Sequence, residues 1–168
     1  MEIRRLRKGD EDRLREVRLR ALAESPSAFA STLEREQQFG ADVWVSRVTR
    51  EESATFLAEE DGRPLGTATG FVEEDPATVH LVGMWVDPSA RGTGVAGRLV
   101  ETVVDWARER DARRVELWVT VLNHRARALY ERHGFSPTGD RQPLPSDPDI
   151  LEDRFERPLP VREPSAER

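Results

Sequence analysis

The chain lacks several of the residues on which common site chemistries depend. Among its 168 residues there is no cysteine, a single lysine (Lys8) and only three histidines. Without cysteine there is no disulfide framework, thiol nucleophile, thiolate zinc site or iron–sulfur cluster. Three scattered histidines argue against a dedicated metal site. No apolar run approaches the roughly 20 residues that span a bilayer, and no apolar signal core follows the N-terminus. We therefore expect a cytoplasmic protein with no metal and no membrane partner.

Composition and charge narrow the class of protein further. Charged residues make up 35% of the chain and apolar residues 37%, with a mean hydropathy of −0.66. This composition is typical of a folded domain with a heavily charged surface, and the length suits one domain. We expect that domain to cover residues 1–159, followed by a flexible tail at 160–168. The net charge of −6 argues against a nucleic-acid partner.

Hydrophobic periodicity predicts an alternation of strands and helices. Strands are expected at 2–6, 54–58, 65–72, 79–86, 115–121, 135–139 and 150–159. Helices are expected from Asp10 to Ser25, through most of 28–50, at 94–110 and at 123–134, and a proline-rich loop at 141–149. The order β-α-α-β-β-β-α-β-α-β-β predicts an α/β fold with a mixed sheet and helices on both faces. Gly83 lies inside a predicted strand, which indicates a bulge or the close approach of another chain.

A glycine-rich segment connects the strand at 79–86 to the helix that begins at Gly94. Gly92 and Gly94 lie in a short loop that opens directly into this helix. The first N–H groups of a helix have no intrahelical partners, and the helix dipole adds partial positive charge there. Glycines let an anion approach the backbone closely. The segment therefore predicts a phosphate-binding turn.

Several phosphate ligands are compatible with such a turn. A P-loop requires a lysine after its second glycine, and this segment has none. The spacing Gly92-x-Gly94-x-x-Gly97 matches a dinucleotide fingerprint formally. In that fold, however, the loop follows the first strand of a parallel array and an acidic residue ends the next strand. Here three predicted antiparallel strands precede the loop, and Leu122-Asn123 follow the next strand. A turn without any ligand is the remaining alternative.

The pattern Arg91-x-x-Gly94-x-Ala96 resembles the pyrophosphate-binding motif Gln/Arg-x-x-Gly-x-Gly/Ala of the GNAT N-acetyltransferase superfamily. Three further features match that family: Asn123 after the fifth strand, Tyr130 seven residues later, and then Gly134-Phe135. The similarity is strong over residues 79–139. Over residues 3–72 it rests on the order of the elements alone.

This resemblance implies a GNAT-like fold in which the fourth and fifth strands splay apart. It implies that acetyl-CoA is the co-substrate and that its acetyl group passes directly to a primary amine in a ternary complex, without a metal. The pantetheine arm would pair with the backbone of Met84, Trp85 and Val86, and Asn123 would contact CoA. The pyrophosphate would bind the turn formed by Arg91, Gly92, Thr93, Gly94, Val95, Ala96 and Gly97.

The resemblance also implies two catalytic residues. Tyr130, the only tyrosine, would donate a proton to the leaving sulfur, unless it is merely a packed helix residue. His80 stands where family members often have a glutamate base, and its unperturbed pKa suits that role, directly or through water. If His80 is only a packing residue, water or a carboxylate such as Glu116 would take the proton. His124 and His133 are expected to be solvated.

The acceptor cannot be read from the sequence beyond a small-molecule, peptide or protein amine. We expect residues 25–32 and 141–149 to flank its cleft. A homodimer is compatible with the resemblance. The alternative function is a non-catalytic CoA-binding module, although such a module would not need an acid at the sulfur.

Overall fold

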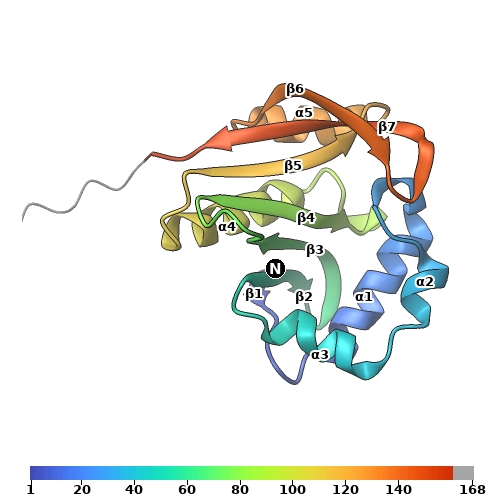
Figure 1. Ribbon diagram of the computed structural model, residues 1–168. Helices are drawn as coiled ribbons and strands as arrows, with labels where there is room; N and C mark the ends of the chain where they lie inside the picture. The colour runs from blue at the N-terminus through green and yellow to red at the C-terminus, as the bar shows by residue number, and fades with distance from the viewer. Residues whose placement is uncertain (161–168) are drawn as a thin grey trace, which may run out of the picture.

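The computed structural model describes residues 1–160, so the expected tail falls outside the described residues after Pro160. Seven strands form one sheet in the order β1-β2-β3-β4-β5-β7-β6 (Figure 1). Neighbouring strands are antiparallel except for the parallel pair β4–β5. The predicted mixed sheet is therefore confirmed. The strands are β1 (Glu2–Arg5), β2 (Ser53–Glu60), β3 (Arg63–Phe71), β4 (Thr78–Val86), β5 (Arg114–Thr120), β6 (Ser136–Leu144) and β7 (Asp147–Pro158).

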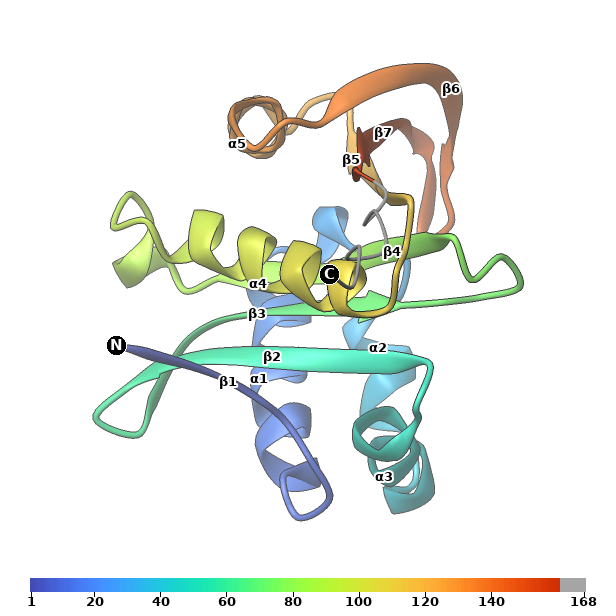
Figure 2. The same cartoon turned by 90° about the vertical axis from the view of Figure 1, so that its left-hand side faces the viewer.

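Helices cover both faces of this sheet, as the sequence predicts. One face packs against α4 (Val95–Glu109) and α5 (His124–Arg132), and the other against α1 (Glu11–Glu24), α2 (Leu33–Gln37) and α3 (Ala41–Thr49). Figure 2 shows α1–α3 grouped together, apart from α4 and α5. Each face has its own cluster of buried apolar side chains. No helix within residues 1–160 is long and apolar enough to cross a membrane.

Glycines on β3 let α4 lie very close to the sheet. A Cβ atom at Gly70 would lie 2.8 Å from the Trp106 ring of α4, and one at Gly66 would lie 3.1 Å from Leu99 Cδ1. Real Cβ atoms rarely approach other atoms so closely, so a larger residue at either position would push the helix outward. The position of α4 matters because the glycine-rich turn leads into its first residue.

The bulge predicted at Gly83 is present in β4. Gly83 has φ +61°, and the β3–β4 register shifts between Thr67 and Thr69. An extra residue in one strand reverses the alternation of side chains beyond it. Val79 therefore packs with the α4 cluster, whereas Trp85 packs with the α1 cluster.

The expectation of a proline-rich loop at 141–149 is wrong. The segment is a tight hairpin in which β6 runs to Leu144 and β7 begins at Asp147. Proline removes a backbone donor and is tolerated in edge strands. In the described sheet β6 is an edge strand, and the first residues of β7 pair only with β6, so Pro143 and Pro148 break no central ladder.

Two details at the N-terminal helices also differ from expectation. Asp10 precedes α1 as predicted, but its carboxylate accepts hydrogen bonds from the Arg4 guanidinium and the Arg7 N–H instead of capping the helix. The helical region at 28–50 is divided into α2 and α3, with Gly40 at the start of α3.

Candidate functional site

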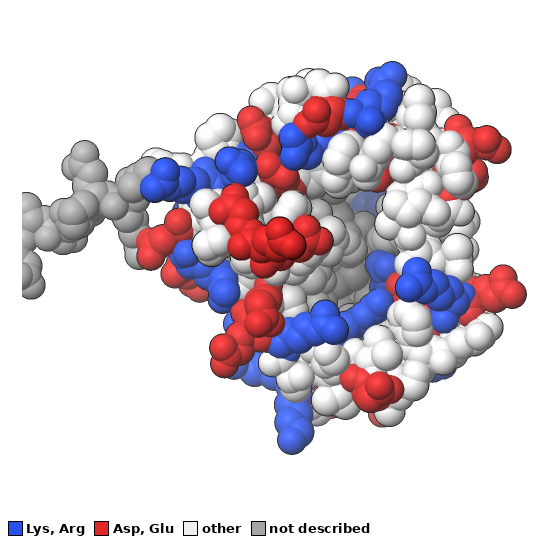
Figure 3. Space-filling view, viewed as in Figure 1, with Lys and Arg blue, Asp and Glu red and all other residues white. Residues whose placement is uncertain are grey.

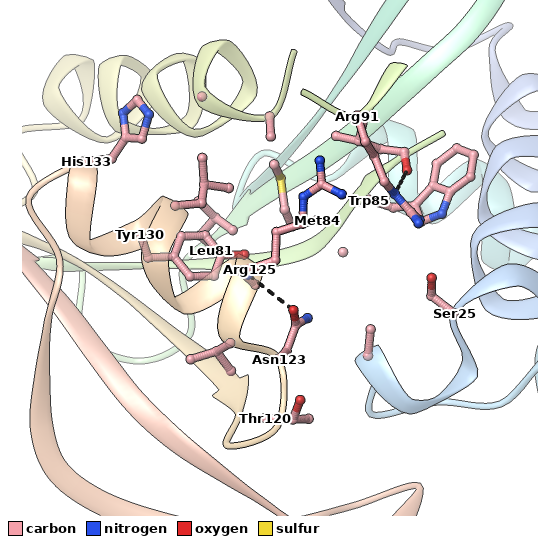
Figure 4. A pocket seen from close by; sticks show the side chains of 18 of the residues that line it. Ser25, Leu81, Met84, Trp85, Arg91, Thr120, Asn123, Arg125, Tyr130 and His133 are labelled. Carbon is pink, nitrogen blue, oxygen red and sulfur yellow. Dashed lines mark hydrogen bonds between the residues drawn. The ribbon is translucent and has the colours of Figure 1, made fainter. Parts of the chain in front are cut away.

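Strands β4 and β5 pair over three residues only and then separate. The paired residues are Thr78 to His80 on β4 and Arg114 to Glu116 on β5. Beyond them β4 stays paired with β3, and β5 with β7. A cavity of about 620 Å³ opens between the separated strands and extends to the start of α4. In Figure 4, Tyr130 and Asn123 approach it from α5 and its N-cap, Met84 from β4, and Ser25 from the segment after α1.

The splay leaves one edge of β4 free along the cavity. Residues 81–86 of β4 have β3 on one side and no strand on the other within the described chain. Such an edge presents unpaired N–H and C=O groups that an extended ligand can pair with, as an added strand would. Met84, Trp85 and Val86, the residues predicted to contact pantetheine, all line the cavity.

The glycine-rich turn, residues 91–97, forms one end of the cavity. Gly92 and Gly94 have φ +80° and +89°, a left-handed conformation that favours glycine. The N–H groups of Gly92 and of residues 94–97 have no backbone acceptor among residues 1–160. Nothing lies within 4 Å of a Cβ built on Gly94. Free donors, a helix N-terminus and open space together form an anion site, which fits a pyrophosphate.

Not every residue of this turn faces open space. Arg91 donates from Nε to the Val86 carbonyl oxygen at 3.1 Å and from Nη2 to Glu24 Oε2 at 2.6 Å. Burial opposes ionisation of Glu24, but hydrogen bonds from Ser25, Arg91 and Trp85 outweigh it and lower the pKa of Glu24. The Arg91 side chain therefore ties the turn to the end of α1.

Tyr130 and Asn123 both line the cavity. Asn123 caps α5, because its Oδ1 accepts a hydrogen bond from the Ala126 N–H at 3.1 Å, which leaves its amide N–H groups free to donate. Tyr130 is 5% exposed, and its ring packs edge-on against Phe135. Burial raises the pKa of the Tyr130 phenol well above its ordinary value, so the hydroxyl stays protonated at neutral pH. Its oxygen makes no hydrogen bond within residues 1–160.

Two side chains beside the glycine-rich turn, those of Arg125 and His133, were not predicted from the sequence to belong to the site. Arg125 Nη2 lies 3.9 Å from the position of a Cβ on Gly92. His133, expected to be solvated, is instead half-buried: its ring lies against Gly97, and its Nδ1 is 2.8 Å from Glu101 Oε1. His124 is exposed, as expected. The repeated Arg and His residues of α5 were the available signal, but their direction depends on how α5 packs.

His80 and Glu116 lie next to each other in the β4–β5 pair. The His80 ring stacks on Phe71 at 5.1 Å between centroids, and His80 is not among the described residues that line the cavity. Glu116 is 7% exposed, and its two oxygens accept from Arg114 at 3.0 Å and from Arg154 at 3.3 Å. Neither side chain presents a free basic atom to the described cavity surface.

Of the two segments expected to flank the acceptor, only the one at 25–32 lines the cavity. Ser25, Ala28 and Phe29 line it. The β6–β7 hairpin does not line it, but Ser146 Oγ at the hairpin tip donates to the Phe29 carbonyl oxygen. Figure 3 shows the hollow on this face of the molecule. The contact joins the β6–β7 hairpin to the segment that lines the cavity.

This chain is similar in sequence to known acetyltransferases. The model of the acetyltransferase (GNAT) family matches residues 16–135. Mycothiol acetyltransferases from Beutenbergia cavernae and Thermomonospora curvata are 36% and 37% identical over 70% and 76% of this chain. The chain spans only 38% and 41% of the length of these relatives.

Solved structures agree on the fold. The ribosomal-protein-S18-alanine N-acetyltransferase from Escherichia coli has a TM-score of 0.72 and 19% identity, with 99% of each chain covered. A Salmonella typhimurium protein solved with its cofactor acetyl-CoA has a TM-score of 0.77 and 20% identity, covering 99% of this chain and 98% of that one. At such identities the likeness concerns the fold alone. With a family model that covers more than half of its residues, the chain belongs to the acetyltransferase (GNAT) family.

Proposed function

We propose that this chain is an acetyl-CoA-dependent N-acetyltransferase that passes an acetyl group directly to a primary amine in a ternary complex. The observation that supports this most is the separation of β4 from β5 into a cavity that ends at the glycine-rich turn. One cavity thus combines an anion site, a free strand edge and a buried phenol. The match of the acetyltransferase (GNAT) family model to residues 16–135 supports acetyl transfer.

The residues present fit acetyl-CoA by their donors and by the space above them. The free N–H groups of residues 94–97 would hold the pyrophosphate, with the Arg125 guanidinium beside them. The free edge of β4 at Met84 to Val86, apart from the Val86 carbonyl that accepts from Arg91, would pair with the amide groups of pantetheine. The amide N–H groups of Asn123 are free to donate to CoA. When bound, acetyl-CoA supplies an acetyl thioester as the acyl donor.

Direct attack by the amine needs no covalent enzyme intermediate, which suits a chain without cysteine. A backbone N–H of β4 aimed at the thioester carbonyl would stabilise the oxyanion that develops during attack. Tyr130 is neutral and its hydroxyl makes no other hydrogen bond within the described chain, so it is free to donate to the departing sulfur.

The acceptor amine must also lose a proton. Both Glu116 oxygens are held by arginines, and His80 is stacked on Phe71 outside the cavity lining. We therefore propose that a water molecule accepts the proton of the amine, and that His80 acts as a base only through this water.

The test is release of free thiol from acetyl-CoA, measured with and without a panel of primary amines. Amine-dependent release, with the acetylated amine identified by mass spectrometry, is the expected result. Tight binding of acetyl-CoA without turnover on any amine would favour the alternative, a non-catalytic CoA-binding module. Absence of acetyl-CoA binding would contradict both.

A further inference from the structure

The guanidinium of Arg18 lies beside the β4 bulge and makes only some of the hydrogen bonds that it can donate. Arg18 of α1 donates from Nε and Nη2 to the carboxylate of Glu36, at 2.9 to 3.2 Å. These contacts occupy one edge of the planar guanidinium. Its other terminal nitrogen, Nη1, has no hydrogen-bond partner within residues 1–160. The side chain is 17% exposed, and Nη1 is not among the fully buried atoms that lack a partner, so it is open to a ligand or to water.

This nitrogen lies next to the surface of the cavity. Arg18 Nη1 is 3.8 Å from the position of a Cβ on Gly83, and Thr69 Oγ1 is 3.7 Å from the same point. The guanidinium also stacks on the ring of Phe29, with its carbon 4.8 Å from the centroid. Both Gly83 and Phe29 line the cavity. Arg18 therefore lies between the bulge of β4 and the segment that borders the acceptor end.

The cluster around Arg18 retains a positive charge. Glu36 is fully buried and is the shared partner of Arg18 and of Arg47, whose Nη1 lies 2.9 Å from it. Two guanidinium groups against one carboxylate leave one net positive charge next to Gly83 and Phe29, although the three ionic side chains are not themselves among the described residues that line the cavity. Basic side chains border part of the hollow (Figure 3).

Contacts within the protein fix the Arg18 side chain in the absence of a ligand. Glu36 fixes two of its nitrogens, Phe29 supports its plane, and α1 fixes its backbone. A guanidinium held in this way loses little side-chain entropy on binding an anion, and its geometry suits a carboxylate.

We propose that Arg18 binds a carboxylate of the acceptor, so that the substrates of this enzyme are small amines that also carry a carboxylate group, as amino acids do. This inference rests on the proposed function, because it names the acceptor class for the same cavity. Arg18 would anchor the acceptor at the bulge and so place its amine next to the thioester. Its positive charge would also favour the neutral, nucleophilic form of that amine.

The experiment compares matched pairs of amines that differ in the carboxylate. The pairs are L-alanine with L-alaninamide, L-phenylalanine with L-phenylalaninamide, and 4-aminobutyrate with n-butylamine. We expect at least one carboxylated member to be acetylated with the higher kcat/KM. Arg18→Gln should lower that kcat/KM by roughly 10- to 100-fold, mainly through KM, because a hydrogen-bonded ion pair is lost. The matched amide should change little.

Arg47→Gln is the matched control. It removes the other arginine that binds Glu36, but its guanidinium stacks on Trp44 and Phe39 and does not approach the bulge. It should leave the preference for the carboxylated amine intact. Because Arg18→Gln alone weakens a buried ion pair, the double variant Arg18→Gln with Glu36→Gln is measured as well. It should show the same loss of preference after the buried carboxylate is neutralised, although Arg47, which is 31% exposed, then loses its partner.

Two results would overturn the inference while leaving the proposed function standing. One is amine acetylation in which acid and amide are used equally. The other is an equal loss of kcat on both members in Arg18→Gln, which would place the guanidinium on the thioester. To avoid dependence on turnover, the N-acetylated acids and amides are also titrated into the CoA-bound chain by calorimetry. Equal binding of acid and amide, or binding of neither, would likewise contradict the inference. Failure to bind acetyl-CoA would instead contradict the proposed function.

Discussion

Tyr130 offers the sharpest single-residue test of the chemistry. Its hydroxyl has no partner within residues 1–160, while its ring packs on Phe135. Tyr130→Phe should therefore keep the fold and the KM for acetyl-CoA and lower kcat, since the hydroxyl acts on charge that develops in the transition state. General acid catalysis is typically worth about 10²–10⁴-fold. Steady-state kinetics measure the effect, and circular dichroism checks the fold.

The raised pKa of Tyr130 adds a prediction about pH for the same residue. A phenol with its ordinary value of 10.0 would begin to ionise near that pH, and a proton donor would be lost. Burial keeps Tyr130 protonated to higher pH, so no loss of kcat assignable to Tyr130 should occur around pH 10. An unchanged kcat in Tyr130→Phe, with chemistry rate-limiting, would remove the residue from the mechanism.

Some residues of the candidate site could be predicted from the sequence and others could not, for a physical reason. Gly94, Asn123 and Tyr130 could be predicted because their positions follow from local elements with known spacing. Arg18 and His133 could not, because their environments form only when α1 meets β4 and when α5 closes on α4. His80 shows the converse, since its place on a strand could be predicted, while packing turned its ring onto Phe71.

The contact between α4 and β3 gives a prediction for an element. Gly70→Ala places a methyl group 2.8 Å from the Trp106 ring, which has no flexible end that can move aside. Overpacking of this kind typically costs about 1–3 kcal/mol. We expect a loss of that size in the free energy of unfolding, measured by urea denaturation. Adding Trp106→Leu should reduce the cost of the alanine, because the two sites are in contact. Strict additivity of the two changes would contradict the proposed packing.

Among the elements, periodicity predicted α4 and β5 well and the β6–β7 hairpin poorly. The alternation of Val115, Leu117 and Val119 is set by one buried face, which a sequence displays directly. The hairpin contains prolines and few apolar residues, and it forms because β7 extends beyond β5 and pairs with an edge strand. That pairing is a property of the sheet and leaves little local signal.

The stability of the whole molecule should depend on pH through Glu36. Burial opposes its ionisation, but hydrogen bonds from Arg18 and Arg47 outweigh it and lower the pKa of Glu36 to about 2. A lowered pKa stabilises the folded state above the unfolded value of 4.5, and this stability is lost as the pH falls from there towards about 2. At about 1.36 kcal/mol for each pH unit, the contribution is roughly 3 kcal/mol.

Glu36→Gln should therefore be less stable at pH 7 and should lose less stability between pH 4.5 and pH 2. Glu34→Gln, at an exposed position of the same helix, should follow the wild type. Denaturant unfolding at a series of pH values measures both. Parallel curves for wild type and Glu36→Gln would show that this ion cluster does not set the acid stability of the molecule.

The central claim is that the cavity between β4 and β5 is where this chain binds acetyl-CoA. Hydrogen exchange of backbone amides with and without acetyl-CoA tests it most directly. The control pair is Gly94→Val and Gly62→Val, since both glycines are left-handed with nothing within 4 Å of an added Cβ. Only Gly94 belongs to the glycine-rich turn; Gly62 lies between β2 and β3.

In the wild type and in Gly62→Val, acetyl-CoA should slow exchange at Gly92, at residues 94–97 and at residues 84–86, because the ligand accepts from the free N–H groups of the turn and pairs with that strand edge. In Gly94→Val both effects should require much higher concentrations of acetyl-CoA. Protection confined to another surface, or equal protection in Gly94→Val and the wild type, would contradict the account.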